Sequence, residues 1–146
     1  MQLLVVNTLL FLGWTLMLYW IHRTVHRLSS LNRFHRAHHK YIKFNNSNWT
    51  YKNLVLYTDN KDSTIDMWTT EVIPTILFCI VFNASWIFVL YYIWAAFLQD
   101  TLEHSNLNWY PLTMGKWHMV HHKDARKNFG LFLPIWDKIF KTEKYS

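Results

Sequence analysis

The chain has 146 residues, which is enough for one domain and no more. Hydrophobic residues make up 51% of it, yet the mean hydropathy is only −0.04, because apolar and polar residues occupy separate stretches. A single cysteine excludes a disulfide framework and the cysteine-containing structural zinc sites. The net charge of +6 is compatible with a nucleic-acid partner, but the basic residues flank apolar runs, which indicates a membrane surface and no nucleic acid.

The first element is an uncharged run of 20 residues from Gln2 to Ile21. As a helix it would be about 30 Å long, which matches the hydrocarbon thickness of a bilayer. A signal peptide is the competing interpretation, but no basic residue precedes the run, and Tyr19 and Trp20 fit an interfacial aromatic belt better. We therefore expect this segment to span a membrane.

Two histidines follow directly, His22 and His26, at the i, i+4 spacing by which a helix binds one metal ion. If the helix continued unbroken, the next histidines along the chain would face away from this pair, because each residue turns by about 100°. Ser29 and Ser30 supply capping residues between them. The sequence therefore predicts a break there and a new helix from about Ser30.

The pattern HxxHH occurs twice, in Phe34 to Lys40 and in Trp117 to Lys123. Histidines at i, i+3 and i+4 share one helical face, so we expect each box to aim three imidazoles at one point. The boxes contribute His35, His38 and His39, then His118, His121 and His122. Only His104 stands outside the three motifs.

A single histidine pair on a helix is more often a surface or hydrogen-bonded feature than a ligand set. Three boxes in one short chain weaken that interpretation. Eight box histidines exceed what one tetrahedral ion needs, and imidazole suits iron, copper, nickel or zinc. The sequence therefore predicts two metal ions that share eight or nine imidazoles.

The second apolar region runs from Val72 to Gln99. If it crossed a membrane once, the boxes before and after it would lie on opposite faces. Asn83-Ala84-Ser85 offers a turn, which predicts a hairpin of one helix from about Thr64 to Phe82 and another from about Ser85 to His104. A shallow re-entrant hairpin is the alternative. Basic residues are concentrated in the segments before and after this hairpin. Because such residues favour the cytosolic side of a membrane, we expect the boxes to lie in the cytosol.

The remaining segments read mainly as loops. Asn45 to Asn48 is a predicted loop, and the chain from there to Asp62 could cover the site. Asn128-Phe129-Gly130 is a turn signal. Ile135 to Phe140 is either an interfacial amphipathic turn or an ordinary packing helix. Four arginines interleave with the first two boxes and form either an anionic-lipid face or a surface for an acidic partner: Arg23, Arg27, Arg33 and Arg36.

The order HxxxH, HxxHH, HxxHH, with a hydrophobic hairpin before the last box, resembles the fatty acid hydroxylase and sterol desaturase superfamily of membrane di-iron enzymes. Leu102 to Leu107 is similar to the family's HSN segment, and His121 to Thr142 is similar to its C-terminal signature. The resemblance implies one all-α domain over residues 1–146 in the membrane: an N-terminal spanning helix, a helical hairpin, and a cytosolic histidine-rich helical cap that holds a di-metal site.

The resemblance also implies the ligands, which are His22, His26, His35, His38, His39, His104, His118, His121 and His122. Asp100 stands where some members have a further histidine. Glu103 and Asp124 are candidates to orient the ligands, as is Asp137, for which a solvated charge is the alternative. The family often has an acidic residue before the first box, and this chain has none. Only one spanning helix precedes that box, as in a minimal or truncated member.

The implied activity is an O₂-dependent hydroxylation or desaturation of a fatty acyl chain or sterol at two iron ions, with zinc possible after purification. Electrons would come from an external donor, either a b-type cytochrome with its reductase or a ferredoxin-like protein. The implied location is the endoplasmic reticulum membrane if the source is eukaryotic. The alternatives are a haem-binding protein, an inactive or zinc-binding membrane relative, and a zinc-dependent hydrolase.

Overall fold

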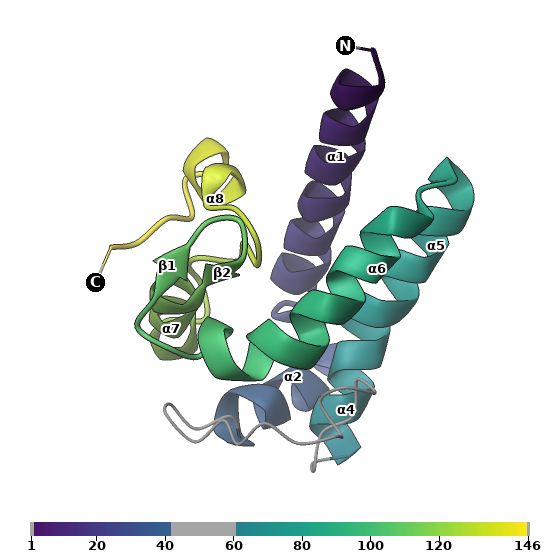
Figure 1. The fold of residues 1–146 in the computed structure, drawn as a ribbon. Helices are drawn as coiled ribbons and strands as arrows, with labels where there is room; N and C mark the ends of the chain where they lie inside the picture. Colours follow the sequence, from purple (N-terminus) through teal and green to yellow (C-terminus); the bar gives the residue numbers. More distant parts are fainter. Residues whose placement is uncertain (1, 42–60, 146) are drawn as a thin grey trace.

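A computed structural model describes residues 2–41 and 61–145, without the side chains of Tyr41, Asp100 and Thr101. The loop predicted at Asn45 to Asn48, and most of the segment expected to cover the site, lie outside the described residues. The described part is mostly helical, as expected (Figure 1). Its elements are α1 (Gln2–Val25), α2 (Ser29–Tyr41), α4 (Lys61–Met67), η1 (Trp68–Val72), α5 (Ile73–Phe82), α6 (Ser85–Trp94), η2 (Ala95–Glu103), β1 (Asn108–Trp109), β2 (Thr113–Met114), α7 (Gly115–Lys123) and α8 (Ile135–Ile139).

The predicted break after the first histidine pair is confirmed. α1 ends at Val25, and α2 begins four residues later. The amide of Leu28 donates to the carbonyl of Thr24 at 3.1 Å, which closes the turn between the helices. Asn32 Nδ2 then donates to the carbonyl of His26 at 2.9 Å and satisfies one acceptor at the end of α1.

The predicted hairpin is also confirmed. Its first arm runs without interruption through α4, η1 and α5, and its second arm through α6 and η2. Asn83 makes the turn with a left-handed φ of 50°, a conformation that asparagine tolerates better than most residues. The amide of Ala84 donates to the carbonyl of Cys79 at 3.0 Å and ends the first arm.

The expectation of an all-α fold is wrong in one detail, since β1 and β2 form a two-stranded antiparallel hairpin. Asn108 pairs with Met114, and Trp109 pairs with Thr113. The chain must reverse between η2 and α7, and tryptophan and threonine favour extended backbone. The amide of Leu112 donates to the carbonyl of Trp109 at 2.7 Å within this reversal.

The core centres on Trp14, which is fully buried. Its ring lies 4.7 Å from Phe132 and 6.3 Å from Tyr91, measured between ring centroids. Its Nε1 donates to Thr75 Oγ1 at 3.0 Å. One side chain of α1 thereby joins both arms of the hairpin to the C-terminal segment.

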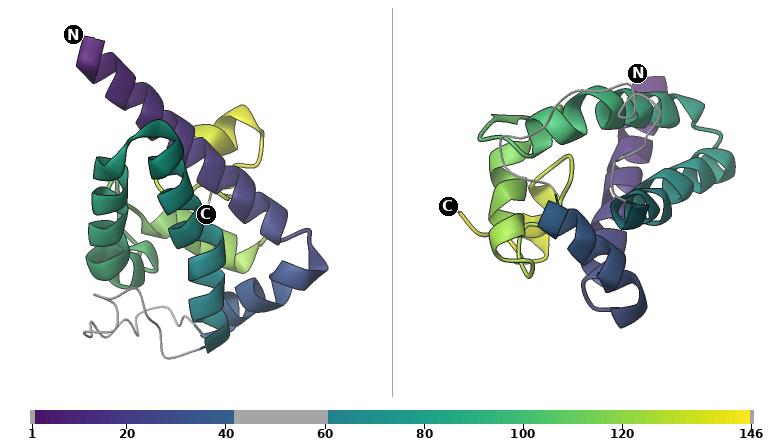
Figure 2. Two further views of the ribbon diagram at one scale, coloured as in Figure 1. Left: turned by 90° about the vertical axis from the view of Figure 1, so that its right-hand side faces the viewer. Right: turned by 90° about the horizontal axis from the view of Figure 1, so that it is seen from below.

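Within residues 2–41 and 61–145, two helices are long and apolar enough to cross a membrane, by length and composition: Gln2–Val25 and Lys61–Phe82. The start of α1 and the α5–α6 turn lie at one end of the molecule, and α2 lies at the other (Figures 1 and 2). Large apolar side chains are exposed at the first end, namely Leu3, Leu4, Val5, Leu9, Leu77, Ile80, Val81 and Phe82. Such a patch marks a surface that meets lipid or protein.

Candidate metal centre

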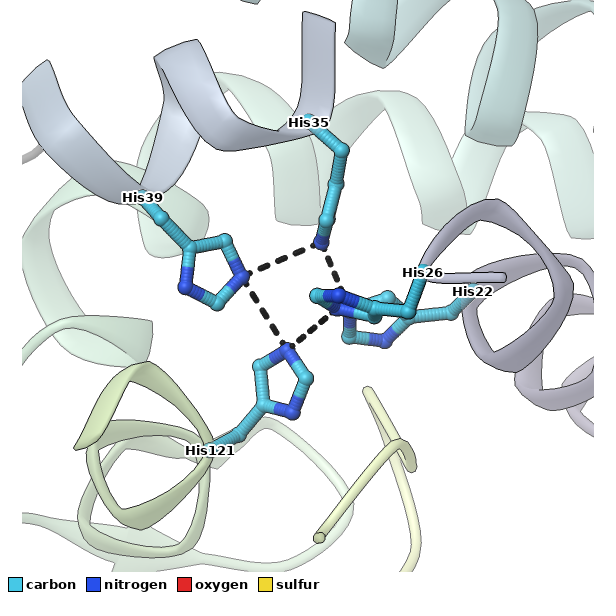
Figure 3. Close-up of side chains that lie close together, drawn as sticks. All are labelled: His22, His26, His35, His39 and His121. Atoms are coloured by element: carbon cyan, nitrogen blue, oxygen red, sulfur yellow. Dashed lines mark hydrogen bonds between the residues drawn. The ribbon is translucent and has the colours of Figure 1, made fainter. Parts of the chain in front are cut away.

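All nine histidines converge and form two groups. The first group consists of His22, His26, His35, His39 and His121, whose imidazoles point to a common centre (Figure 3). The second group consists of His38, His104, His118 and His122. Within each group, every pair of potential ligand atoms lies within 4.8 Å. They come from α1 with its following turn, α2, the turn after η2, and α7.

The structure corrects the expectation that the three imidazoles of one HxxHH box converge on one point. His35 and His39 belong to the first group, whereas His38 of the same box belongs to the second. His118 and His122 belong to the second group, whereas His121 of the same box belongs to the first. Residues i and i+4 are only about 40° apart around a helix, while i+3 is displaced by about 60° to the other side. Each box therefore contributes to both groups.

Backbone carbonyls fix the tautomers of two histidines in the first group. His22 Nδ1 donates to the carbonyl of Phe129 at 2.8 Å, and His121 Nδ1 donates to that of Lys127 at 2.7 Å. A carbonyl oxygen can only accept a hydrogen bond, so the ring proton of each neutral imidazole lies on Nδ1. Each Nε2 atom then carries a lone pair that points into the group.

A third tautomer is fixed by a residue that sequence reasoning did not assign to the site. His35 Nδ1 donates to Asp66 Oδ2 at 2.8 Å. Asp66 lies on α4, 31 positions from the histidine, and belongs to no histidine motif. It is one of three acids near the start of the first hairpin arm, with Asp62 and Glu71, and no sequence pattern separates it from them.

The Nε2 atoms of the first group approach one another closely. His39 Nε2 lies 3.1 Å from the Nε2 atoms of both His35 and His121. His22 Nε2 lies 3.1 Å from His35 Nε2, and His26 Nε2 lies 3.0 Å from His121 Nε2. His22 and His35 both carry the ring proton on Nδ1, so their two Nε2 atoms cannot hydrogen-bond to each other. Nitrogens about 2.1 Å from one ion and about 90° apart would be about 3.0 Å from each other, so the group fits a metal ion.

The second group also brings imidazole nitrogens close together. His118 Nε2 lies 2.9 Å from His122 Nε2. His104 Nδ1 donates to the carbonyl of Gln99 at 3.1 Å, which leaves its Nε2 as an acceptor. That Nε2 atom is buried and has no hydrogen-bond partner among the described residues. Glu103 is buried beside the group, with Oε1 3.7 Å from His118 Nδ1. These atoms also fit a metal ion.

Burial lowers the pKa of seven of these histidines and so disfavours their protonated form. It lowers the pKa of His26 and of His39 to about 3, that of His104 to about 4 and that of His122 to about 2. For most of them, neighbouring imidazoles lower the pKa further, because two protonated rings would repel. Three more histidines have pKa values well below the ordinary range for the same reasons: His38, His118 and His121. At neutral pH these seven imidazoles therefore offer lone pairs to a cation.

The two groups adjoin each other and a small cavity. Apolar walls of the cavity come from Leu18 and Leu131. Histidines of both groups line it, together with polar residues of the two hairpin arms; these residues are His22, His35, His38, His118, Thr70, Glu71, Gln99 and Glu103. A small molecule in this cavity would contact both groups.

The polar residues of the cavity lie on two π-helical segments, η1 and η2. Glu71 of η1 accepts hydrogen bonds from Tyr91 Oη at 3.1 Å and from Gln99 Nε2 at 3.3 Å. Short π-helical segments occur often at functional sites, since the extra residue in the turn redirects side chains. Here the π-helical turns carry Glu71 and Gln99, which line the cavity.

The other acidic candidates have different surroundings. Asp124 accepts hydrogen bonds from Lys144 Nζ at 3.1 Å and from Arg126 Nε at 3.2 Å, so its described partners are basic surface residues. These hydrogen bonds lower the pKa of its carboxyl to about 2. The side chain of Asp100 lies outside the described part of the chain.

Asp137 is fully buried, which corrects the alternative of a solvated charge. Its carboxylate accepts hydrogen bonds from the amides of Phe129 at 2.8 Å and Gly130 at 2.9 Å, and from Trp117 Nε1 at 3.0 Å. A Cβ on Gly130 would approach this carboxylate to 2.9 Å, so the turn requires glycine. Asp137 thus holds the turn whose carbonyl fixes the tautomer of His22.

Comparison with known proteins identifies the family of the chain. Protein CER1-like 1 of Arabidopsis thaliana is 24% identical over 144 residues, which cover 85% of this chain and 21% of that protein. The very-long-chain aldehyde decarbonylases GL1-4 and GL1-5 of Oryza sativa subsp. indica are 26% and 27% identical, with the same coverage. The chain thus spans about a fifth of the length of these relatives. No solved structure matches. The family model for fatty acid hydroxylase matches residues 7–142, and the chain therefore belongs to the fatty acid hydroxylase family.

Proposed function

We propose that the protein is a membrane-bound di-iron oxidoreductase that uses O₂ to hydroxylate or desaturate a lipid. The observation that carries this proposal is the convergence of nine imidazoles into two adjacent groups. All nine histidines serve as ligands in this proposal. The family match and the relatives named as very-long-chain aldehyde decarbonylases support a lipid substrate.

The size of the first group favours iron over zinc. Five histidines converge there, whereas a structural zinc ion takes four ligands and a catalytic one usually takes three from the protein. Iron accepts a higher coordination number with imidazole. An inactive or zinc-binding relative remains the alternative, and metal analysis separates the two.

The exposed apolar end of the molecule supports a location in a membrane. The start of α1 and the tip of the hairpin would enter the lipid, and the histidines would lie at its cytosolic rim, near the basic residues of α2 and α7. A lipid chain would then reach the histidine groups from the bilayer side. If the source is eukaryotic, we propose the endoplasmic reticulum membrane as the location.

The reaction needs electrons and protons from outside the chain. Hydroxylation converts a C–H bond, O₂, two electrons and two protons into an alcohol and water, whereas desaturation removes two hydrogens and yields two waters. Bound iron supplies the redox chemistry that O₂ requires. The protein residues hold the ligand tautomers, exclude bulk water through burial and orient the lipid. We propose that a b-type cytochrome with its reductase, or a ferredoxin-like protein, donates the electrons.

A long-chain aldehyde is a second candidate substrate. The cavity beside the histidines is partly polar, with Thr70, Glu71 and Gln99 in its wall. Such a wall suits an oxygenated carbon better than a plain hydrocarbon segment. The relatives named as aldehyde decarbonylases make the same substrate class worth testing.

The test is lipid analysis of cells that express the full chain or the His121→Ala variant. The variant removes a ligand of the first group, so it should abolish any oxidised lipid product. Lys123→Ala is the matched control, because this exposed residue lies on the same helix. Fatty acids and fatty aldehydes should be supplied in parallel cultures to separate the two substrate classes.

The proposal predicts a new alcohol or alkene with the native chain and with Lys123→Ala, and none with His121→Ala. Product formation that persists in the His121→Ala variant would contradict it. Purified protein that carries zinc alone, and oxidises no lipid with iron, reductant and O₂, would favour the zinc-binding alternative.

A further inference from the structure

Asp66 lies outside every histidine box, yet its carboxylate faces the first histidine group. It is only 4% exposed, and its Oδ2 accepts the proton of His35 Nδ1 at 2.8 Å. Its other oxygen, Oδ1, is buried without a hydrogen-bond partner among the described residues. An ionised carboxylate in such a place is costly unless positive charge lies nearby.

The position of His35 shows where that charge would come from. Its Nε2 lies 3.1 Å from His22 Nε2 and 3.1 Å from His39 Nε2, at the centre of the first group. A cation held there would be separated from Asp66 by one imidazole ring. Within the same group, His22 and His121 are backed by neutral backbone carbonyls instead. His35 is thus the histidine of this group whose described Nδ1 partner is a carboxylate.

On the basis of the proposed function, we infer that Asp66 is a positioning residue that fixes the tautomer and orientation of His35 and supplies counter-charge to the ion of the first group. A carboxylate behind a ligating histidine raises the basicity of the ring and holds its orientation. Asp66 lies on the first arm of the hairpin and His35 on α2. The bond therefore also ties the apolar hairpin to the metal centre.

The test compares Asp66→Asn with Asp62→Asn in the full chain, purified in detergent and freed of metal. An asparagine at 66 keeps an acceptor for His35 but loses the charge. Asp62 is exposed and lies one turn earlier on α4, so its variant removes the same charge from the same helix. The probe is cobalt(II), titrated against a chelator, with its visible absorption recorded.

We expect two cobalt ions per native chain. Asp66→Asn should bind one of them about 10- to 100-fold more weakly and with an altered absorption spectrum, while the other ion is unaffected. Asp62→Asn should match the native protein. Native affinity and spectrum for both ions in Asp66→Asn would overturn the inference, because a merely structural role would leave the spectrum unchanged.

A second measurement needs no variant at position 66. Nitrogen NMR of the zinc-loaded native chain should find the proton of His35 on Nδ1, and a proton on Nε2 would overturn the inference. A native chain that binds two ions but oxidises no lipid would contradict the proposed function alone, since the affinity comparison still decides the role of Asp66. A native chain that binds no cobalt would overturn both.

Discussion

The ring of His39 stacks on the ring of His122, with 4.2 Å between their centroids and 26° between their planes. His39 belongs to the first histidine group and His122 to the second. The two groups are therefore in direct contact, although their members come from separate parts of the chain. Two ions held by these groups would share the adjoining cavity, as in enzymes that use a metal pair.

Single replacements should remove one ion at a time. His26 contributes only to the first group, and His104 contributes only to the second. We expect His26→Ala and His104→Ala each to lower the metal content from about two ions to about one ion per chain. Metal analysis after loading and gel filtration in detergent provides the count. Two retained ions in either variant would remove that histidine from the ligand set.

Glu103 and Asp124 should behave differently, although the sequence suggests similar roles. Glu103 is 1% exposed and lies beside His118, whereas Asp124 pairs with Lys144 at the surface. Glu103→Gln is expected to weaken metal binding by about 10- to 100-fold, and Asp124→Asn to leave it unchanged. Chelator competition measures both. Equal affinities in the two variants would contradict the assignment of Glu103 to the site.

Asp137 should matter for folding before it matters for metal binding. Asp137→Ala leaves four buried donors without their acceptor, among them the amides of Phe129 and Gly130. We expect the free energy of unfolding to fall by about 3 kcal/mol. Asp137→Asn keeps one acceptor oxygen and should cost less. Denaturant unfolding in detergent measures both losses, and a native-like Asp137→Ala would show that the turn is held by other contacts.

The metal-free chain should lose stability in acid. His26, His39, His104 and His122 have folded pKa values of about 3, 3, 4 and 2, below the ordinary value of 6.5. Between pH 6.5 and about 3 the unfolded chain therefore binds more protons than the folded chain. Stability is then full above pH 6.5 and falls as the pH drops through this window. Thermal unfolding at stepped pH checks this, and a flat profile from pH 7 to pH 4 would contradict it.

The elements of the fold follow from local patterns in the sequence. The uncharged run predicts α1, the serines at 29 and 30 predict the break before α2, and Asn83 predicts the hairpin turn. The small β-hairpin was not predicted, because Asn108 to Met114 has no alternating pattern of any length. The π-helical segments also have no pattern that distinguishes them from α-helix.

The candidate site was predictable in its ligands but not in what holds them. Spacing alone singles out the histidines of the three boxes. The acceptors behind them include the carbonyls of Phe129, Lys127 and Gln99, and every residue has a carbonyl, so no residue type marks them. Asp66 approaches His35 only because the hairpin packs on α2. The division of each HxxHH box likewise depends on where the neighbouring helices lie.

The most direct test of the account is the iron content and ligation of the full chain, purified in detergent and loaded with iron(II) without oxygen. The account predicts about two iron ions per chain, with X-ray absorption dominated by nitrogen neighbours at about 2.1 Å, the usual distance from imidazole to a divalent ion. One ion or none per chain, or ligation mainly by oxygen, would contradict the claim that these histidines form two metal sites.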